Sequence, residues 1–126
     1  MNAPENLRYT KDHEWIRVEG SFGWIGVTDH AQGELGDIVF VELPKIGAVL
    51  EQGKAFGTVE AVKAVSDLFA PVSGEVVDVN KEVQDSPEVV NKEPYERGWM
   101  VKVKMENADE LKQLLDAAGY AKLVAK

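Results

Sequence analysis

An internal repeat is the feature that most constrains the fold of this chain. Residues 44–54 align with residues 71–81, at an offset of 27, and proline, glycine, valine and lysine recur at matching positions. Each copy is typical of a turn entered by proline, a short strand and a second turn, where Gly53 and its counterpart Asn80 tolerate positive φ. Two copies are too few for a solenoid. The repeat therefore predicts two similar half-sheets that face each other as a small β-sandwich, with chance similarity between two turn–strand–turn units as the alternative.

A single lysine lies near the middle of the segment that joins the two copies, residues 55–70. If both arms are strands, Lys63 lies at the tip of a hairpin, far from the core. Small apolar residues surround it, and acids flank them at a distance, in the run Glu60-Ala61-Val62-Lys63-Ala64-Val65-Ser66-Asp67. An enzyme that must recognise one amine benefits from such isolation. The repeat and the central position favour a modified lysine over an ordinary surface lysine.

The remainder of the first three-quarters of the chain is also predicted to be mainly β. Trp15–Val18 and Phe22–Val27 are β-rich runs, and residues 19–21 between them suit a hairpin turn. A further strand is expected over Val39–Leu43 and ends at Pro44, because proline cannot donate to a sheet ladder.

Helical signals are short by comparison. Thr28 can cap a helix over Asp29–Leu35, and Gly36 can end that helix in the left-handed conformation. Towards the C-terminus a half-buried strand is predicted, with Trp99, Val101, Val103 and Met105 on its apolar face and Met100, Lys102 and Lys104 on the other. A final helix is expected after this strand, with Asn107 or Asp109 as its cap and Gly119 as its end, and it contains Leu111, Leu114 and Leu115. One or two more helical turns are expected over Tyr120–Lys126.

Composition limits the classes of function. The 126 residues suit one domain, residues 1–126, and the net charge of −8 argues against a nucleic-acid partner. The chain has no cysteine, so disulfides and thiolate metal sites are excluded, and His13 and His30 do not form a metal-spaced cluster. No apolar run is long enough for a membrane span, and Met1–Asn6 shows no signal peptide. A soluble protein of the cytoplasm, or of an organelle after processing, is expected.

A hairpin-tip lysine that carries an acyl group becomes a swinging arm, because its flexible stem holds a cofactor at high effective concentration near any docked enzyme. Such a carrier needs no catalytic residues, and the chain contains no nucleophile elbow, Gly-rich phosphate loop or HExxH element. Biotin and lipoate are both attached in this way. Biotin carriers usually place the lysine between two methionines, whereas Lys63 lies between Val62 and Ala64, which favours lipoate.

From Leu7 to Tyr120 the sequence resembles the glycine cleavage system H proteins. The resemblance rests on the order and spacing of several runs: 11–15 (KDHEW), 26–32 (GVTDHAQ), 35–44 (LGDIVFVELP), 60–64 (EAVKA), 70–76 (APVSGEV), 91–95 (NKEPY) and 98–99 (GW). One departure is Ala61, where the family usually has serine. This change should matter little to acylation of Lys63, because the lost hydroxyl is two residues from the amine.

The resemblance implies a barrel-sandwich hybrid of the lipoyl/biotinyl-carrier kind, with short flanking helices and a C-terminal helix. It implies that Lys63 carries lipoate, attached by a lipoate ligase or a lipoyl/octanoyl transferase. The arm then serves a pyridoxal-phosphate glycine decarboxylase (P protein), a tetrahydrofolate-dependent aminomethyltransferase (T protein) and a dihydrolipoyl dehydrogenase (L protein). A monomer is expected, in the bacterial cytoplasm or in the mitochondrial matrix if a eukaryotic chain has been processed.

In the family the loaded arm is also sheltered in a cleft on the carrier. Glu14 and Asp67 match positions near that cleft, and a buried ammonium group needs such carboxylates, with ordinary surface charge as the alternative. His30 fits either the cleft or simple packing. Trp15 and Trp99 are expected in the core.

Two other functions compete with the glycine cleavage carrier. A related lipoyl protein could relay lipoate to other carriers without a role in glycine breakdown, and the sequence does not separate the two. A small enzyme could use Glu14 and Asp67 as an acid–base pair. That hypothesis requires activity in the absence of Lys63.

Overall fold

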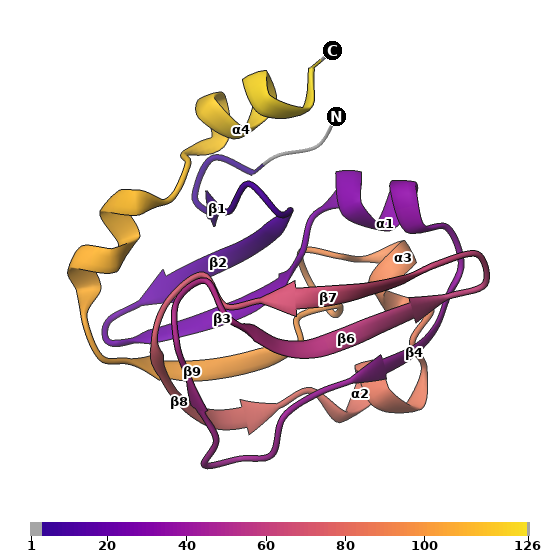
Figure 1. The fold of residues 1–126 in the computed structure, drawn as a ribbon, viewed down its shortest axis with the longest axis horizontal. Helices are drawn as coiled ribbons and strands as arrows, with labels where there is room; N and C mark the ends of the chain where they lie inside the picture. Colours follow the sequence, from indigo (N-terminus) through magenta and orange to yellow (C-terminus); the bar gives the residue numbers. More distant parts are fainter. Residues whose placement is uncertain (1–3, 126) are drawn as a thin grey trace.

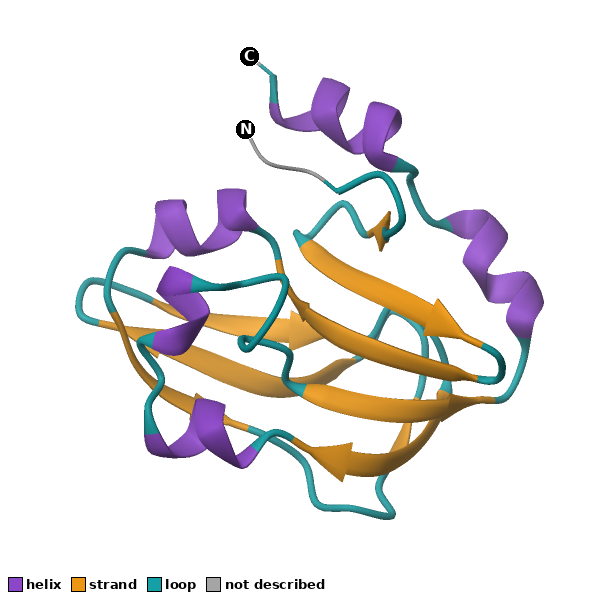
Figure 2. Cartoon of the chain, turned by 180° about the vertical axis from the view of Figure 1, so that it is seen from behind, coloured by secondary structure: helices purple, strands orange, loops and turns teal. Residues whose placement is uncertain are grey.

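The computed structural model describes residues 4–125 and contains two antiparallel sheets. The six-stranded sheet has the order β1-β2-β3-β9-β8-β5, and the three-stranded sheet has the order β4-β6-β7. Figure 1 shows the smaller sheet lying across the larger one, and Figure 2 shows the same two layers from behind. The large sheet contains β1 (Arg8–Tyr9), β2 (Glu14–Glu19), β3 (Phe22–Val27), β5 (Val49–Leu50), β8 (Gly74–Val79) and β9 (Val101–Met105), and the small sheet contains β4 (Ile38–Glu42), β6 (Ala55–Ala61) and β7 (Val65–Phe69).

The helices are short and flank the sheets, which confirms the mainly β class with a C-terminal helix. They are α1 (Asp29–Leu35), α2 (Lys81–Asp85), α3 (Val89–Lys92), the 3₁₀ helix η1 (Ala108–Gln113) and α4 (Ala117–Val124). Within the described residues, no helix is long and apolar enough to cross a membrane. The first part of the segment Met1–Asn6, in which no signal peptide was expected, lies outside the described residues.

The two copies of the internal repeat lie in one sheet, so the prediction of two facing half-sheets was wrong for the repeat itself. Strand β5 of the first copy pairs antiparallel with β8 of the second, with Val49 opposite Glu75. The chain leaves and re-enters this sheet at one place, because Gly53 N–H donates to Ala70 O and Ala70 N–H donates to Lys54 O. These bonds close the base of the β6–β7 hairpin and bring the two copies together.

The aligned residues Gly53 and Asn80 have different backbone conformations. Gly53 has φ 85°, whereas Asn80 has φ −81° and caps α2 by accepting from Glu82 N–H. The Asn80 amide also donates to the carbonyl oxygens of Arg97 and Trp99. Asn80 is therefore a buried structural hub, a role that its tolerance of positive φ did not indicate.

Helix α1 forms over the predicted residues. Thr28 Oγ1 accepts from Ala31 N–H at its start, and Gly36 ends it. The φ of Gly36 is 80° as expected, but its ψ of −153° lies outside the left-handed helical region. This combination is open almost only to glycine.

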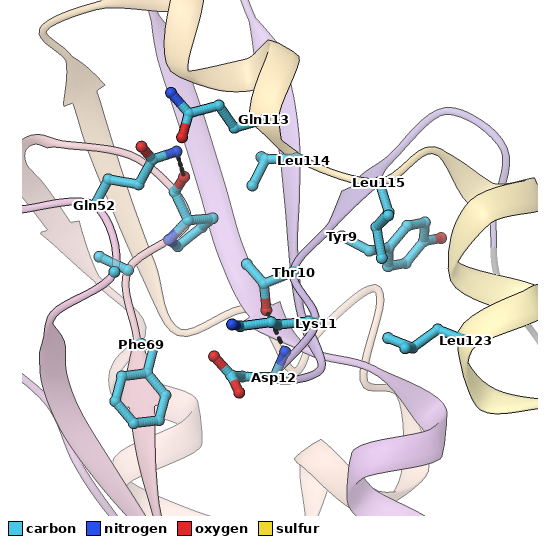
Figure 3. Close-up of a pocket in the computed structure, with 13 residues that line it drawn as sticks. Tyr9, Thr10, Lys11, Asp12, Gln52, Phe69, Gln113, Leu114, Leu115 and Leu123 are labelled. Atoms are coloured by element: carbon cyan, nitrogen blue, oxygen red, sulfur yellow. Dashed lines mark hydrogen bonds between the residues drawn. The ribbon is translucent and has the colours of Figure 1, made fainter.

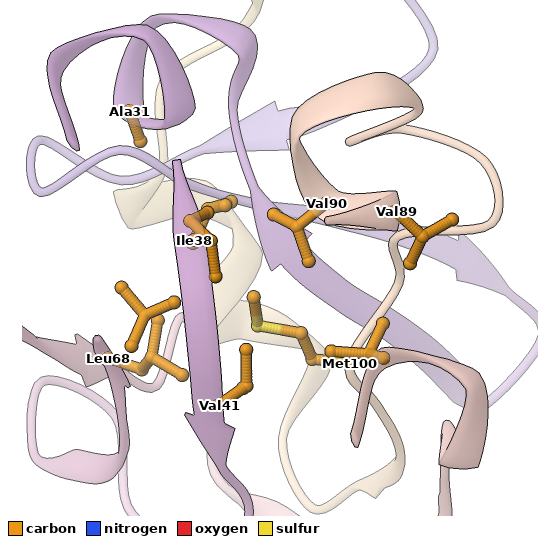
Figure 4. Packing of buried hydrophobic residues seen from close by; sticks show 10 residues of the cluster. Ala31, Ile38, Val41, Leu68, Val89, Val90 and Met100 are labelled. Atoms are coloured by element: carbon orange, nitrogen blue, oxygen red, sulfur yellow. The ribbon is translucent and has the colours of Figure 1, made fainter. Parts of the chain in front are cut away.

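Two predictions near the C-terminus were wrong. Met100 was placed on the polar face of a strand, yet it is fully buried beside Ile38 and Val41 because β9 begins only at Val101 (Figure 4). Gly119 was expected to end the last helix, yet it lies within α4, which Asp116 caps by accepting Gly119 N–H. The expected single helix is instead η1 and α4, separated by an extended segment that bridges to Tyr9.

Candidate functional site

Lys63 lies at the exposed tip of the β6–β7 hairpin, as the sequence predicted. The tip is short and regular, because Ala61 N–H donates to Ala64 O at 2.7 Å. None of the ion pairs among residues 4–125 involves Lys63. The amine is therefore accessible, and its acylation would break no ion pair.

The turn between α1 and β4 supports the hairpin tip from one side. Val62 N–H donates to Asp37 O at 3.0 Å, and Ile38 pairs with Ala61. The stem of Lys63 lies over Gly36, where a Cβ atom would be only 3.3 Å from Lys63 Cε. Glycine is thus required at residue 36 for its backbone conformation, and the absent side chain also leaves room for the lysine stem.

Asn91 holds this supporting turn from the other side. Its amide donates to Gly36 O at 2.8 Å and to Gln32 Oε1 at 3.0 Å, and its Oδ1 accepts from Ile38 N–H at 2.9 Å. The side chain therefore bonds both flanks of Asp37, the residue that accepts from the hairpin tip. The sequence assigned no role to Asn91, because these contacts depend on α3 packing beside α1, which no local pattern encodes.

We expect Asn91→Ala to loosen the hairpin tip specifically. The variant should lose about 1–3 kcal/mol of stability and show faster hydrogen exchange at the Val62 amide. Asn80→Ala is the matched control, since Asn80 also makes three hydrogen bonds through its side-chain amide but away from the tip. It should lose similar stability and leave exchange at Val62 unchanged. Equal acceleration in both variants would contradict a specific role for Asn91.

Glu14 is almost completely buried, with 1% of its surface exposed. Its carboxyl group accepts from the Thr10 hydroxyl at 2.5 Å and from Phe69 N–H at 3.1 Å. These bonds favour the charged form, but burial outweighs them and raises the pKa of Glu14 to about 7. Glu14 therefore joins the start of β2 to the end of β7, and it can change protonation near neutral pH.

Figure 3 shows an open pocket, of about 550 Å³, whose wall does not include Glu14 itself. Thr10 and Phe69, the two hydrogen-bond partners of Glu14, both line it. Its size is within the range of roughly 300–1,000 Å³ that is usual for small-molecule sites. Four segments of the chain form its wall: residues 9–12, 52–53, 69–71 and 113–115, with Leu123 of α4.

Asp67 and Glu14 are in different environments. Asp67 is exposed on β7, opposite Thr58, and lies two residues before Phe69, whose N–H bonds Glu14. Lys63 is at the opposite end of β7 from that N–H. Strand β7 thus has Lys63 just before its start, Asp67 in its middle and the hydrogen-bond partner of Glu14 at its end. The structure shows no direct contact among the three predicted residues.

The other candidates belong to packed clusters. Trp15 is fully buried, as predicted, and its indole N–H donates to the carbonyl oxygens of Val27 and Pro94. Trp99 is partly buried against the same cluster. His30 lies against His13, with ring centroids 4.6 Å apart, and is not part of the pocket wall.

Tyr120 was not singled out by the sequence, although it anchors α4. Its hydroxyl lies 2.8 Å from His13 Nδ1 and 2.7 Å from Thr28 Oγ1, and its ring stacks on Tyr9 at 4.6 Å. Burial raises the pKa of Tyr120 to about 12 and, together with His30, lowers that of His13. This cluster holds α4 beside the pocket.

Comparison with known proteins gives a consistent answer. The family model for the glycine cleavage H-protein matches residues 7–126. The chain belongs to this family. It is 55% identical to the glycine cleavage system H protein of Bacteroides fragilis over 124 residues, or 98% of each chain, and 54% identical to that of Staphylococcus carnosus over 126 residues, the whole of each chain.

A solved structure supports the same assignment. The crystal structure of a glycine cleavage system H protein from Mycobacterium marinum superposes with a TM-score of 0.87 and 40% sequence identity, covering 94% of this chain and 96% of that one. The fold expected from the resemblance is therefore confirmed. As a member of the H-protein family, the chain is a lipoyl carrier component of the glycine cleavage system.

Proposed function

We propose that Lys63 is the residue that carries lipoate, joined to its amine as an amide. The observation that supports this most directly is its position: an exposed lysine, free of described ion pairs, at the tip of a hairpin whose backbone is held by hydrogen bonds. The residues around it are small, so an acylating enzyme can reach the amine. The site therefore fits the cofactor that H proteins of this family carry.

Attachment needs an activated lipoyl donor and the chain's own amine. The Lys63 nitrogen attacks the acyl carbon, the new C–N bond forms, the bond to the donor's leaving group breaks, and the amine proton passes to solvent. Acylation removes the positive charge of the lysine. Once attached, lipoate supplies a disulfide/dithiol pair that accepts, carries and releases the aminomethyl group.

The chain presents the lipoyl arm to other enzymes and does not itself catalyse a reaction. Its partners in this proposal are the glycine decarboxylase, the aminomethyltransferase and the dihydrolipoyl dehydrogenase, with a lipoate ligase or a lipoyl/octanoyl transferase for attachment. A tethered arm reaches each docked active site at high effective concentration. A monomeric carrier can visit them in turn, and the bacterial relatives favour the bacterial cytoplasm.

Glu14 and Asp67 are proposed to shelter the loaded arm. Asp67 lies on the strand that leads from Lys63 towards the pocket, and Glu14 lies beneath the Thr10–Phe69 part of the pocket wall. An aminomethyl ammonium group would be stabilised by these carboxylates, and a cation there would favour the charged form of Glu14. Asp67, which is exposed, would face the ammonium group directly, and the buried Glu14 would add a negative charge behind the pocket wall.

The test begins with the intact mass of the purified chain before and after incubation with lipoate, ATP and a lipoate ligase. One lipoyl addition, located on the peptide that contains Lys63, is expected. No addition to a folded chain would overturn the proposal.

Reconstitution with glycine decarboxylase then separates the cleavage carrier from a lipoate-relay protein. The cleavage carrier should support release of carbon dioxide from glycine, whereas a relay protein would accept lipoate and fail this step.

A further inference from the structure

The outer face of the three-stranded sheet is uncovered. Helices α2 and α3 pack against its inner face, behind the sheet in Figure 1 and in front of it in Figure 2. Cross-strand pairing places six side chains in two rows on the outer face: Phe40, Glu60 and Val65 in one row, and Glu42, Thr58 and Asp67 in the next.

Exposed apolar residues concentrate at the end of this sheet that carries Lys63. Val39, Phe40, Val62 and Val65, here named the tip patch, are between 50% and 75% exposed. They make up four of the seven large apolar side chains that are exposed among the described residues. Phe40 and Val65 share the outer face, Val62 lies in the turn between β6 and β7, and Val39 lies at the register irregularity next to Phe40. Single exposed apolar residues need no explanation, whereas several exposed close together are typical of an interaction site.

Acidic residues adjoin the tip patch. Glu60 lies between Phe40 and Val65, and Glu42 and Asp67 lie in the neighbouring row. Apart from Lys63 at the tip, the charged groups of these two rows are all carboxylates. An apolar patch with an acidic surround is complementary to an apolar recess with a basic rim.

We propose that the tip patch and its three carboxylates form the docking surface for the enzyme that acylates Lys63. The inference rests on the proposed function of Lys63. This enzyme meets the chain before lipoate is attached, so its binding energy must come from protein surface around the amine. Of the enzymes that could attach lipoate, we expect a ligase that activates the acid as a phosphate anhydride, because the arginine and lysine residues that bind phosphate would also make its active-site entrance basic.

Phe40 is the expected anchor of this interface. It is the only aromatic residue of the tip patch, and large aromatic side chains dominate the energetics of protein interfaces. Half of its surface is exposed on the outer face, and it belongs to none of the core clusters among the described residues. Its removal should therefore weaken docking more than folding.

The test measures steady-state acylation of Phe40→Ala by a lipoate ligase. KM for the unmodified chain should rise about tenfold, with kcat within about twofold of wild type. Ile46→Ala is the matched control, because Ile46 is 66% exposed and lies outside the tip patch and its two rows. It should keep the wild-type KM. Calorimetry without acyl donor should show the same loss of affinity in Phe40→Ala.

Two further variants keep the result decisive. Val65→Thr replaces Phe40→Ala if the latter lowers the melting temperature, because threonine keeps the β-branched shape at a residue that is 66% exposed. Val65→Thr should still raise KM. Glu42→Gln should raise KM at low salt and have no effect at high salt. Wild-type KM in Phe40→Ala and Val65→Thr would overturn the docking surface. Failure of the wild-type chain to be acylated would instead overturn the role of Lys63.

Discussion

Lys63→Arg is expected to show no lipoyl addition in intact-mass measurements, while its melting temperature stays at the wild-type value. Arginine keeps the positive charge and much of the length of the lysine side chain, but its guanidinium group does not form the amide. The residue is exposed at a hairpin tip, so the change in stability should stay within about 0.5 kcal/mol. All carrier function with glycine decarboxylase should be lost with the modification.

Lys54→Arg provides the control for this experiment. Lys54 is also exposed and lies in the turn at the base of the same hairpin. It should accept lipoate as wild type does and keep full carrier function. Continued modification of Lys63→Arg would show that another lysine is the attachment residue. A large loss of stability in Lys63→Arg would show that the tip has a structural role.

The second large effect is expected from the pH dependence of stability through Glu14. Burial raises the pKa of Glu14 in the folded chain from 4.5 to about 7. Below pH 4.5 the carboxyl group is protonated in both states, so its contribution to stability is fully present. As pH rises from 4.5 to 7, the unfolded chain ionises first, and up to about 3 kcal/mol of stability is lost.

Glu14→Gln should remove this dependence, because glutamine is neutral at every pH and can still accept from Phe69 N–H. Urea unfolding from pH 4.5 to pH 8 measures the difference between the variant and wild type. The variant should become the more stable of the two as pH rises towards 8. Glu19→Gln, at the exposed end of the same strand, should follow the wild-type curve. Parallel curves for wild type and Glu14→Gln would show that Glu14 does not titrate in this window.

The same variant tests the proposed shelter for the loaded arm. Without the carboxylate, the aminomethyl group should be more exposed to water and shorter-lived on the isolated carrier. Its rate of release can be followed by mass spectrometry. An unchanged lifetime would remove Glu14 from the shelter and leave Asp67 as the remaining candidate.

Local sequence patterns predicted the elements that depend on neighbouring residues. Helix α1 has the predicted bounds because Thr28 and Gly36 act within one or two turns of the chain. The hairpin that carries Lys63 follows from two short strands with a tight connection, so its tip could be located before any contact was known. The runs of sequence shared with the H-protein family then indicated that this lysine carries lipoate.

Other predictions failed where long-range contacts decided the outcome. The alternation around Met100 resembled a strand face, yet its side chain fills the core formed by β4, α2 and α3. Gly119 resembled a helix stop, but Asp116 caps α4 just before it. Two similar repeats were expected in opposite layers, but closure of the hairpin base pairs them in one sheet.

Short-range patterns in the sequence were enough to predict a mainly β fold and one lysine at a hairpin tip, because turn residues, strand alternation and caps act over short distances. The resemblance to the H proteins added the expectation that this lysine carries lipoate. The environment of that lysine depends on contacts between distant segments. Asn91 supports the hairpin tip from a helix about 30 residues further along the chain. The burial that raises the pKa of Glu14 and the placement of Phe40 beside Val65 likewise depend on contacts between segments that are distant in sequence. Such contacts depend on how the sheets and helices pack, and no local pattern specifies them.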